Sequence, residues 1–260
     1  MRIVDVHEGT SPLVLGFPHT GTHVPGGIVA ELNERGRRLT DTDWHVDSLY
    51  DGLVPDATRV RATHHRYVVD CNRPPDGASL YPGQATTGLV PLTDFDGEPI
   101  WDREPDEAET ARRVEAYHAP YHAALEAQMA RVREAHGFAI LYDCHSIRSR
   151  VPRLFEGVLP DLNIGTNGGA TCDPAIERVV VEACEASSFT SVLNGRFKGG
   201  WSTRRYGRPA TGWHAVQVEI AQATHLASEA LPFDYDPARA APLRETLARI
   251  LDTLSEWRPR

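Results

Sequence analysis

Short apolar runs that end in polar turns alternate along the chain with longer amphipathic stretches. Apolar runs of about four to eight residues bounded by turn residues are typical of buried strands. Longer stretches with apolar residues on one face are typical of helices. The expected strands are Leu13–Phe17 and residues 66–70, 138–142 and 216–220, and the expected helices are residues 43–53, about 106–136, one that opens at Asp173-Pro174, and about 237–257.

Several local signals refine this pattern. The long helix at residues 106–136 contains Pro120 and is expected to bend there. An aspartate followed by proline, as at Asp173-Pro174, favours a capped helix start. Residues 74–105 hold many of the prolines and glycines and predict a long loop over the surface, of the kind that often forms a lid. Residues 163–169 predict a second, glycine-rich loop.

The alternation of strands and helices predicts a three-layer α/β/α fold with a central sheet. A length of 260 residues suits one large domain spanning residues 1–260. The apolar fraction of 41% and the charged fraction of 24% are ordinary for a globular protein.

Charge and composition narrow the partners. A formal net charge of −9 argues against nucleic acid and anionic membranes, which normally bind basic surfaces. No apolar run approaches the roughly 18 residues of a membrane span, and no signal-peptide pattern opens the chain, so we expect a cytoplasmic protein. The four cysteines form no C-x-x-C pair. Among 27 basic residues only Lys198 is a lysine, so the number of arginines by itself carries little information.

Polar residues stand repeatedly at the carboxyl ends of the expected strands. His19 follows the first strand, Asn72 and Arg73 the second, His145 the third, and Glu219 ends the last. Open α/β sheets bind ligands along that edge. The sequence therefore predicts one crevice that all four strand ends share.

Two histidines in that crevice suit a catalytic zinc ion, which takes three protein ligands and leaves one position open. His19 and His145 are the candidates, and an acid near residues 42–47 would complete the set. Asp43 and Asp47 lie one helical turn apart, and both remain open. The nearby alternatives His23 and His45 also remain. The pair His118 and His122 has an H-x-x-x-H spacing but lacks the glutamate of H-E-x-x-H.

Glu219 is the candidate general base. Because side chains alternate along a strand, Gln217 and Glu219 are expected on the face opposite Val216 and Val218. A buried carboxylate needs a partner, and a metal-bound water would supply one. Candidates for holding a substrate carboxylate are Asn72, Arg73, Arg66, Arg196, Arg204 and Arg205. The chain has neither a G-x-S-x-G elbow nor a P-loop, which disfavours serine hydrolases and nucleotide triphosphatases.

As a set, several motifs resemble the N-formylglutamate amidohydrolase (formylglutamate deformylase) family, and the likeness runs from about residue 10 to residue 225. The motifs are FPHTG (17–21), TDWH (42–45), VDCNRP (69–74), ATTGL (85–89), DCHSIR (143–148) and NGRFKGG (194–200), with the stretch 165–174. The resemblance implies a metallocarboxypeptidase-like (phosphorylase/hydrolase-like) fold with a mixed central sheet.

The resemblance also implies chemistry: zinc-dependent hydrolysis of N-formyl-L-glutamate, a small dicarboxylate, to formate and L-glutamate in histidine degradation. One Zn²⁺ per chain would lie on His19, His145 and an acid. Metallocarboxypeptidases carry His-x-x-Glu, whereas Thr22 stands three residues after His19. The acid must therefore come from elsewhere, and the TDWH motif favours Asp43. Asn72 and Arg73 would hold a carboxylate, and Glu219 would be the base.

Other functions remain open at this point. A zinc amidohydrolase for another N-acyl amino acid, or a small carboxypeptidase, would use the same residue types. A non-catalytic protein that binds an amino acid would retain the crevice but not a working metal site. None of the expected ligand types is missing, which favours an enzyme.

Overall fold

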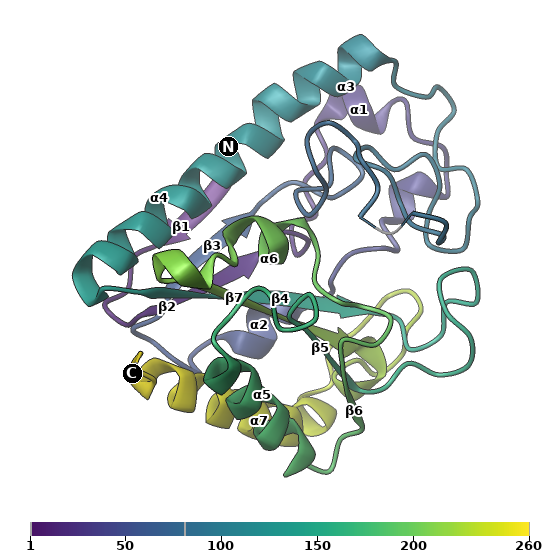
Figure 1. Ribbon diagram of the computed structural model, residues 1–260. Coiled ribbons are helices and arrows are strands. Elements are labelled where there is room, and N and C mark those ends of the chain that lie inside the picture. Colours follow the sequence, from purple (N-terminus) through teal and green to yellow (C-terminus); the bar gives the residue numbers. More distant parts are fainter. Residues whose placement is uncertain (1, 81, 260) are drawn as a thin grey trace.

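A seven-stranded sheet forms the centre of the molecule, which is described here by a computed structural model that covers residues 2–80 and 82–259 (Figure 1). The strand order across the sheet is β1-β3-β2-β4-β7-β5-β6. The strands are β1 (Val4–His7), β2 (Leu13–Phe17), β3 (Thr58–Ala62), β4 (Ala139–Ile147), β5 (Leu162–Gly165), β6 (Ser191–Leu193) and β7 (Trp213–Ala221).

The sheet is mixed. Strands β3, β2, β4 and β7 run parallel to one another. Strand β1 is antiparallel to β3, and β5 is antiparallel to β7, while β6 runs parallel to β5. Helices cover both faces, so the expected three-layer α/β/α arrangement with a mixed sheet is confirmed.

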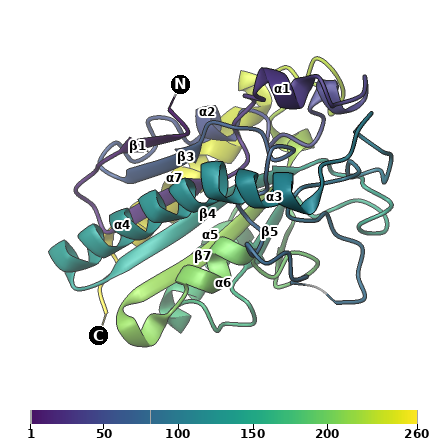
Figure 2. The same ribbon diagram turned by 90° about the horizontal axis from the view of Figure 1, so that it is seen from above.

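Helices α4 and α6 cover one face of the sheet, and α2, α5 and α7 cover the other (Figures 1 and 2). None of the helices in the described part of the chain is long and apolar enough to cross a membrane. The helices are α1 (Gly26–Val29), α2 (Val46–Tyr50), α3 (Glu107–Arg113), α4 (Ala119–His136), α5 (Pro174–Glu185), α6 (Trp201–Tyr206) and α7 (Pro237–Glu256), with 3₁₀ turns at Gly36–Arg38, Pro209–Thr211 and Gln222–Thr224.

Alternation along the central strands decides which residues enter the core. On β4, Tyr142 and Cys144 pack with the α5 and α7 side, whereas Leu141 packs with the α4 side. Beyond Leu141, the α4-side positions of β4 become polar, at Asp143 and His145. On β7, the positions on the same face likewise become polar after Ala215, at Gln217 and Glu219. The carboxyl halves of the two strands therefore place polar side chains on one face, just past the apolar core.

Several sequence predictions are confirmed. Strand β2 has the expected bounds, and α5 begins at Pro174 with the Asp173 side chain accepting a hydrogen bond from Ala175 N. Helix α7 ends at Glu256, one residue before the expected end. The long helix also exists, but it passes through a π-helical segment at Val114–His118, which ends two residues before Pro120, a residue with no N–H to continue a regular pattern.

The strand expected at residues 66–70 is wrong: these residues form a turn and an irregular segment. Tyr67, Val68 and Val69 pack instead with Ile28, Leu32 and Ile100 in a cluster beneath the long loop. The strand of this region is β3, whose Thr-Arg-Val-Arg-Ala sequence carries too few large apolar residues to stand out.

Other boundaries also differ. The helix expected at residues 43–53 is limited to α2, because His45 has a positive φ of 59° that stops an earlier start. Asp43 therefore is not the helix cap. Strand β4 continues to Ile147, so His145 lies within a strand rather than in a turn after it. The loop expected at residues 163–169 begins as strand β5.

The cap of α5 can be tested by substitution. Asp173→Ala removes the acceptor for Ala175 N, and we expect it to lower the free energy of unfolding by about 1 kcal/mol. Asp173→Asn keeps a capping oxygen and should lose much less. Urea unfolding of both variants measures the difference, and an equal loss in both would contradict the capping role.

Candidate active site

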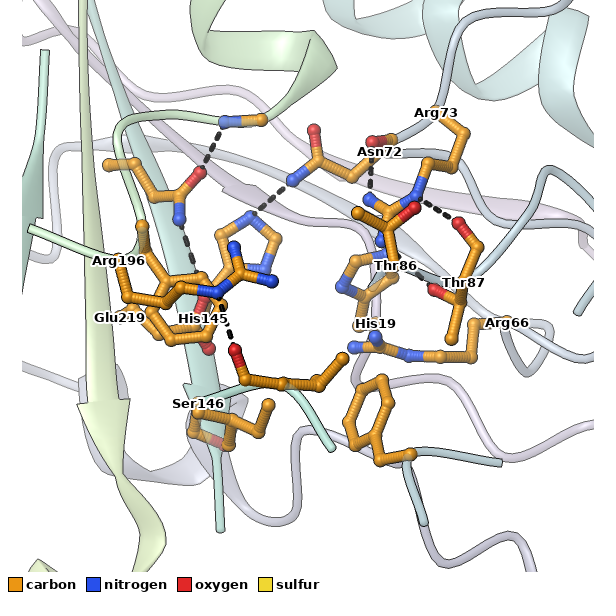
Figure 3. Close-up of a pocket in the computed structure, with 16 residues that line it drawn as sticks. His19, Arg66, Asn72, Arg73, Thr86, Thr87, His145, Ser146, Arg196 and Glu219 are labelled. Atoms are coloured by element: carbon orange, nitrogen blue, oxygen red, sulfur yellow. Dashed lines mark hydrogen bonds between the residues drawn. The ribbon is translucent and has the colours of Figure 1, made fainter. Parts of the chain in front are cut away.

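A cleft opens at the carboxyl ends of β2, β4 and β7, where the sequence analysis predicted a crevice (Figure 3). His19 stands two residues after β2, and its carbonyl accepts a hydrogen bond from Asp43 N at 3.1 Å. That bond ties the segment before α2 to the end of β2. The residues lining the cleft include His19, Arg66, Asn72, Arg73, Thr86, Thr87, Phe95, His145, Ser146, Arg196, Gln217 and Glu219.

Two histidines and one aspartate meet at the base of this cleft. Candidate ligand atoms of His19, Asp43 and His145 all lie within 4.8 Å of one another. Asp43 Oδ2 is 3.2 Å from His145 Nδ1 and 3.7 Å from His19 Nδ1. All three side chains are at most 3% exposed. Two imidazoles and a carboxylate are the donor set of a catalytic zinc site.

Further carboxylates lie beside the outer nitrogens of both rings. His19 Nε2 lies 2.6 Å from Asp70 Oδ1, and His145 Nε2 lies 3.2 Å from Asp143 Oδ1. Asp143 is itself fixed by Thr203, whose hydroxyl donates to Oδ2. Acids in these positions orient metal-binding histidines, and they leave each Nδ1 directed at Asp43.

The side of the site that the two histidines face can accept a cation. His19 Nδ1 is buried and has no hydrogen-bond partner among the described residues. Burial lowers the pKa of His145, but Asp143 and Asp43 outweigh it and hold the pKa well above its usual value. A metal ion at this point would replace a proton and satisfy the orphaned nitrogen. The donor set therefore fits a divalent cation.

Asp43 is held as a carboxylate. Burial raises its pKa, but the charge of Arg66, a hydrogen bond with His145 and the nearby ring of His19 outweigh that effect and hold the pKa well below its usual range. Arg66 Nη2 donates to Asp43 Oδ1, and Ser146 N donates to Oδ2. The acid is thus ready to bind a cation without first losing a proton.

Glu219 reaches the cleft from β7, on the same face as His145. Burial raises the pKa of Glu219 to about 7, an effect that His145 partly opposes. Gln217 Nε2 donates to Glu219 Oε2 at 3.3 Å, and Gly200 N donates to Gln217 Oε1 at 2.7 Å. The backbone at Gly200 therefore turns the amide of Gln217 so that its NH₂ faces Glu219. A buried carboxylate with such a pKa can accept and return a proton near neutral pH.

Asn72 is placed by the same backbone segment. Ser202 N donates to Asn72 Oδ1, which leaves Nδ2 3.0 Å from His145 Nε2. A Cβ at Gly200 would lie 2.3 Å from Asn72 Nδ2. Only glycine permits this close approach.

Two arginines of the cleft contact the long loop that follows Asn72. Arg73 donates from Nε to the Thr87 carbonyl and from Nη2 to the Thr87 hydroxyl, both at 2.9 Å. Arg196 donates to the carbonyls of Leu154 and Ala85. Residues 85–87 are thereby held against the cleft from two sides, and both guanidinium groups line it.

Several candidates lie elsewhere. Asp47 is 37% exposed and lies 3.5 Å from Arg61, outside the histidine cluster. His45 Nε2 lies 3.0 Å from the Phe233 carbonyl. Arg204 donates to the Gly199 carbonyl and is not among the described residues that line the cleft. His23, Arg205 and the exposed Lys198 are likewise not among the described residues that line the cleft.

The pair His118 and His122 is accounted for by hydrogen bonds. His118 Nε2 is 2.9 Å from the Arg73 carbonyl, and His122 bridges the Cys71 carbonyl and the Tyr206 hydroxyl. In the described part of the chain, His19, Asp43 and His145 are the only cluster of potential ligands found.

Sequence reasoning missed the supporting acids Asp70 and Asp143, and it placed Gln217 on the face of Glu219 without giving it a role. Asp70 and Asp143 each stand two residues before a site residue, and Gln217 stands two before Glu219. On β4 and β7 this spacing puts both members of each pair on one face, which was a usable signal. Asp70 lies outside a strand, so no periodicity pointed to it.

Comparisons with known proteins identify the family and similar folds. A family model described as N-formylglutamate amidohydrolase matches residues 11–226. N-formylglutamate deformylases of Pseudomonas putida and Pseudomonas aeruginosa are each 44% identical to this chain over 261 positions, which cover 98% of this chain and 97% of each relative. A crystal structure of an N-formylglutamate amidohydrolase from Ralstonia eutropha JMP134 superposes with a TM-score of 0.84 at 26% identity and covers 98% of both chains.

Metal content distinguishes the two candidate acids. Asp43 Oδ2 faces both histidines, whereas Asp47 faces Arg61. After dialysis against zinc and gel filtration, we expect Asp43→Ala to retain far less than one zinc ion per chain and Asp47→Ala to match the wild type. Retention in Asp43→Ala together with loss in Asp47→Ala would contradict the assignment.

Proposed function

Because the chain belongs to the N-formylglutamate amidohydrolase family, we propose that it hydrolyses the formyl amide of N-formyl-L-glutamate to formate and L-glutamate. The observation that supports this most strongly is the buried His19–Asp43–His145 cluster beside Glu219 in a cleft lined by arginines. The proposal includes one zinc ion on these three residues, which supplies a Lewis acid for the formyl oxygen and activates water.

Substrate binding is assigned to the part of the cleft that carries Asn72, Arg73 and Arg196. Arg73 and Asn72 hold one carboxylate of the substrate, and Arg196 holds the other, since guanidinium groups suit carboxylates geometrically. Residues 85–87 close the space between these arginines. The formyl carbon is thereby placed toward His19 and His145, within reach of the attacking water.

Glu219 moves the proton. It accepts a proton from the attacking water, whose oxygen bonds to the formyl carbon, and it then returns the proton to the amide nitrogen as the C–N bond breaks. Gln217 donates to Oε2 and so orients the carboxylate that transfers the proton. The products are formic acid, which ionises to formate, and L-glutamate, whose amine takes up that proton.

The cellular setting is proposed from the family resemblance and the sequence rather than from the geometry. The family resemblance implies the final step of a histidine-degradation route, and the reaction would take place in the cytoplasm. A second zinc amidohydrolase activity, on other N-acyl amino acids, would use the same zinc site and base. A substrate panel separates the two.

The panel compares N-formyl-, N-acetyl- and N-succinyl-L-glutamate with N-formyl-L-leucine. We expect kcat/KM to be highest for the formyl dicarboxylate, because Arg73 and Arg196 are both available to hold carboxylates in the cleft and formyl is nearly the smallest acyl group. Formate and free amine are measured. Treatment with a chelator should abolish turnover and added zinc should restore it; faster hydrolysis of the acetyl or succinyl compound would refute the assigned substrate.

Substitution of Glu219 tests the base. We expect Glu219→Gln to retain zinc and lose turnover by a factor of at least about 100, the usual scale of general acid–base catalysis. Glu126→Gln, a matched change at an exposed pair with Arg205, should retain full activity.

The wild type provides a pH test of the same residue. The rate of the wild type should fall on acidification, because protonated Glu219 cannot accept a proton. Burial raises the pKa of Glu219 to about 7. The positive charge of a bound zinc ion lowers this pKa, so the acidic fall in rate is expected below pH 7. For the substitution test described above, a near-normal rate of Glu219→Gln would exclude Glu219 as the general base.

A further inference from the structure

One buried arginine binds the oxygen of Asp43 that faces away from the histidines. Arg66 is 5% exposed, and its Nη2 lies 2.5 Å from Asp43 Oδ1. We propose that Arg66 is a positioning residue that limits Asp43 to one metal-binding oxygen and thereby keeps a coordination position open for the substrate. This inference rests on the proposed function, since it takes Asp43 as a metal ligand.

The two oxygens of Asp43 have different partners. Oδ2 accepts a hydrogen bond from Ser146 N at 3.1 Å and also faces the Nδ1 atoms of His145 and His19. A carboxylate oxygen has two lone pairs, so Oδ2 has one for the backbone and one for a metal ion. Oδ1 is directed to the guanidinium instead. The carboxylate therefore presents one oxygen, not both, to the space between the rings.

The number of oxygens matters for catalysis. A catalytic zinc site takes three protein ligands and leaves an open position for water or substrate. If Asp43 bound through both oxygens, it would supply a fourth ligand atom and crowd that position. A charge-assisted hydrogen bond in a buried site is among the stronger polar contacts, because no water competes for it. The bond from Arg66 can thus keep Oδ1 away from the metal.

Arg66 is itself restrained. Its Cζ lies 5.1 Å from the centroid of the Phe95 ring, and Phe95 N donates to Asp41 Oδ2 in the segment that carries Asp43. The guanidinium therefore lies between an aromatic face and the carboxylate that it holds. Lysine could supply one donor there, but not the planar group that stacks on Phe95.

The sequence analysis proposed Arg66 as a substrate-binding residue. Substrate binding and positioning of Asp43 predict different metal coordination in the substrate-free enzyme. A residue that only binds substrate leaves the metal coordination of the substrate-free enzyme unchanged. A residue that positions Asp43 alters that coordination before any substrate is added. The coordination of the metal, rather than the rate, is therefore the decisive measurement.

Cobalt(II) replaces zinc in the test, because four-coordinate cobalt absorbs visible light more strongly than five- or six-coordinate cobalt. We expect the substrate-free wild type to show the intense spectrum and Arg66→Gln to lose intensity as Oδ1 turns to the metal. Arg66→Lys should restore part of it. Arg196→Gln, which changes another cleft arginine that binds backbone carbonyls, should keep the wild-type spectrum. An unchanged spectrum in folded, cobalt-loaded Arg66→Gln would overturn the proposal.

A crystal structure of the zinc-loaded wild type tests the same point without any variant that must fold. We expect Oδ2 to bind zinc and Oδ1 to remain on Arg66; zinc bound to both oxygens would overturn the positioning role. Zinc content and formate release of the wild type are measured alongside. A wild type that binds zinc and releases formate, but with both oxygens on the metal, refutes only this inference, whereas a wild type without zinc refutes the proposed function and the inference with it.

Discussion

The parallel pairing of β4 with β7 is the constraint on which the site depends. Nine residue pairs are aligned between these strands, and the register puts His145 beside Glu219 and Asp143 beside Gln217. The pairing of β2 with β4 then brings the end of β2, and with it His19, to the same edge. Since a shift by one residue would turn every side chain to the opposite face, the backbone hydrogen bonds of the sheet set which groups can meet.

The site concentrates buried charge, and each charge has a specific partner. Asp70 and Asp143 face histidine rings, Asp43 faces Arg66, and Glu219 contacts an amide. Removing charged groups from water is costly, so this part of the molecule works against folding unless its partners are in place. The apolar clusters on both faces of the sheet supply the compensating burial.

Much of this arrangement was accessible from the sequence, because it follows from periodicity. The bounds of β2 and the shared face of Gln217 and Glu219 needed only local pattern. Periodicity did not decide between Asp43 and Asp47, and only the family resemblance favoured Asp43, because the choice depends on the positive φ of His45 and on the distant Arg61. Residues 66–70 were misleading because an apolar run packs equally well beneath a loop as in a sheet.

Lys198 gives the architecture a practical consequence. It is the only lysine of the chain, it is exposed, and it stands between Phe197 and Gly200, which both line the cleft. Amine-reactive reagents therefore meet a single side-chain amine, which adjoins residues of the cleft in the sequence. A fluorophore attached there reports on the cleft in the otherwise unaltered protein, and the same amine offers one defined point for immobilisation on a surface.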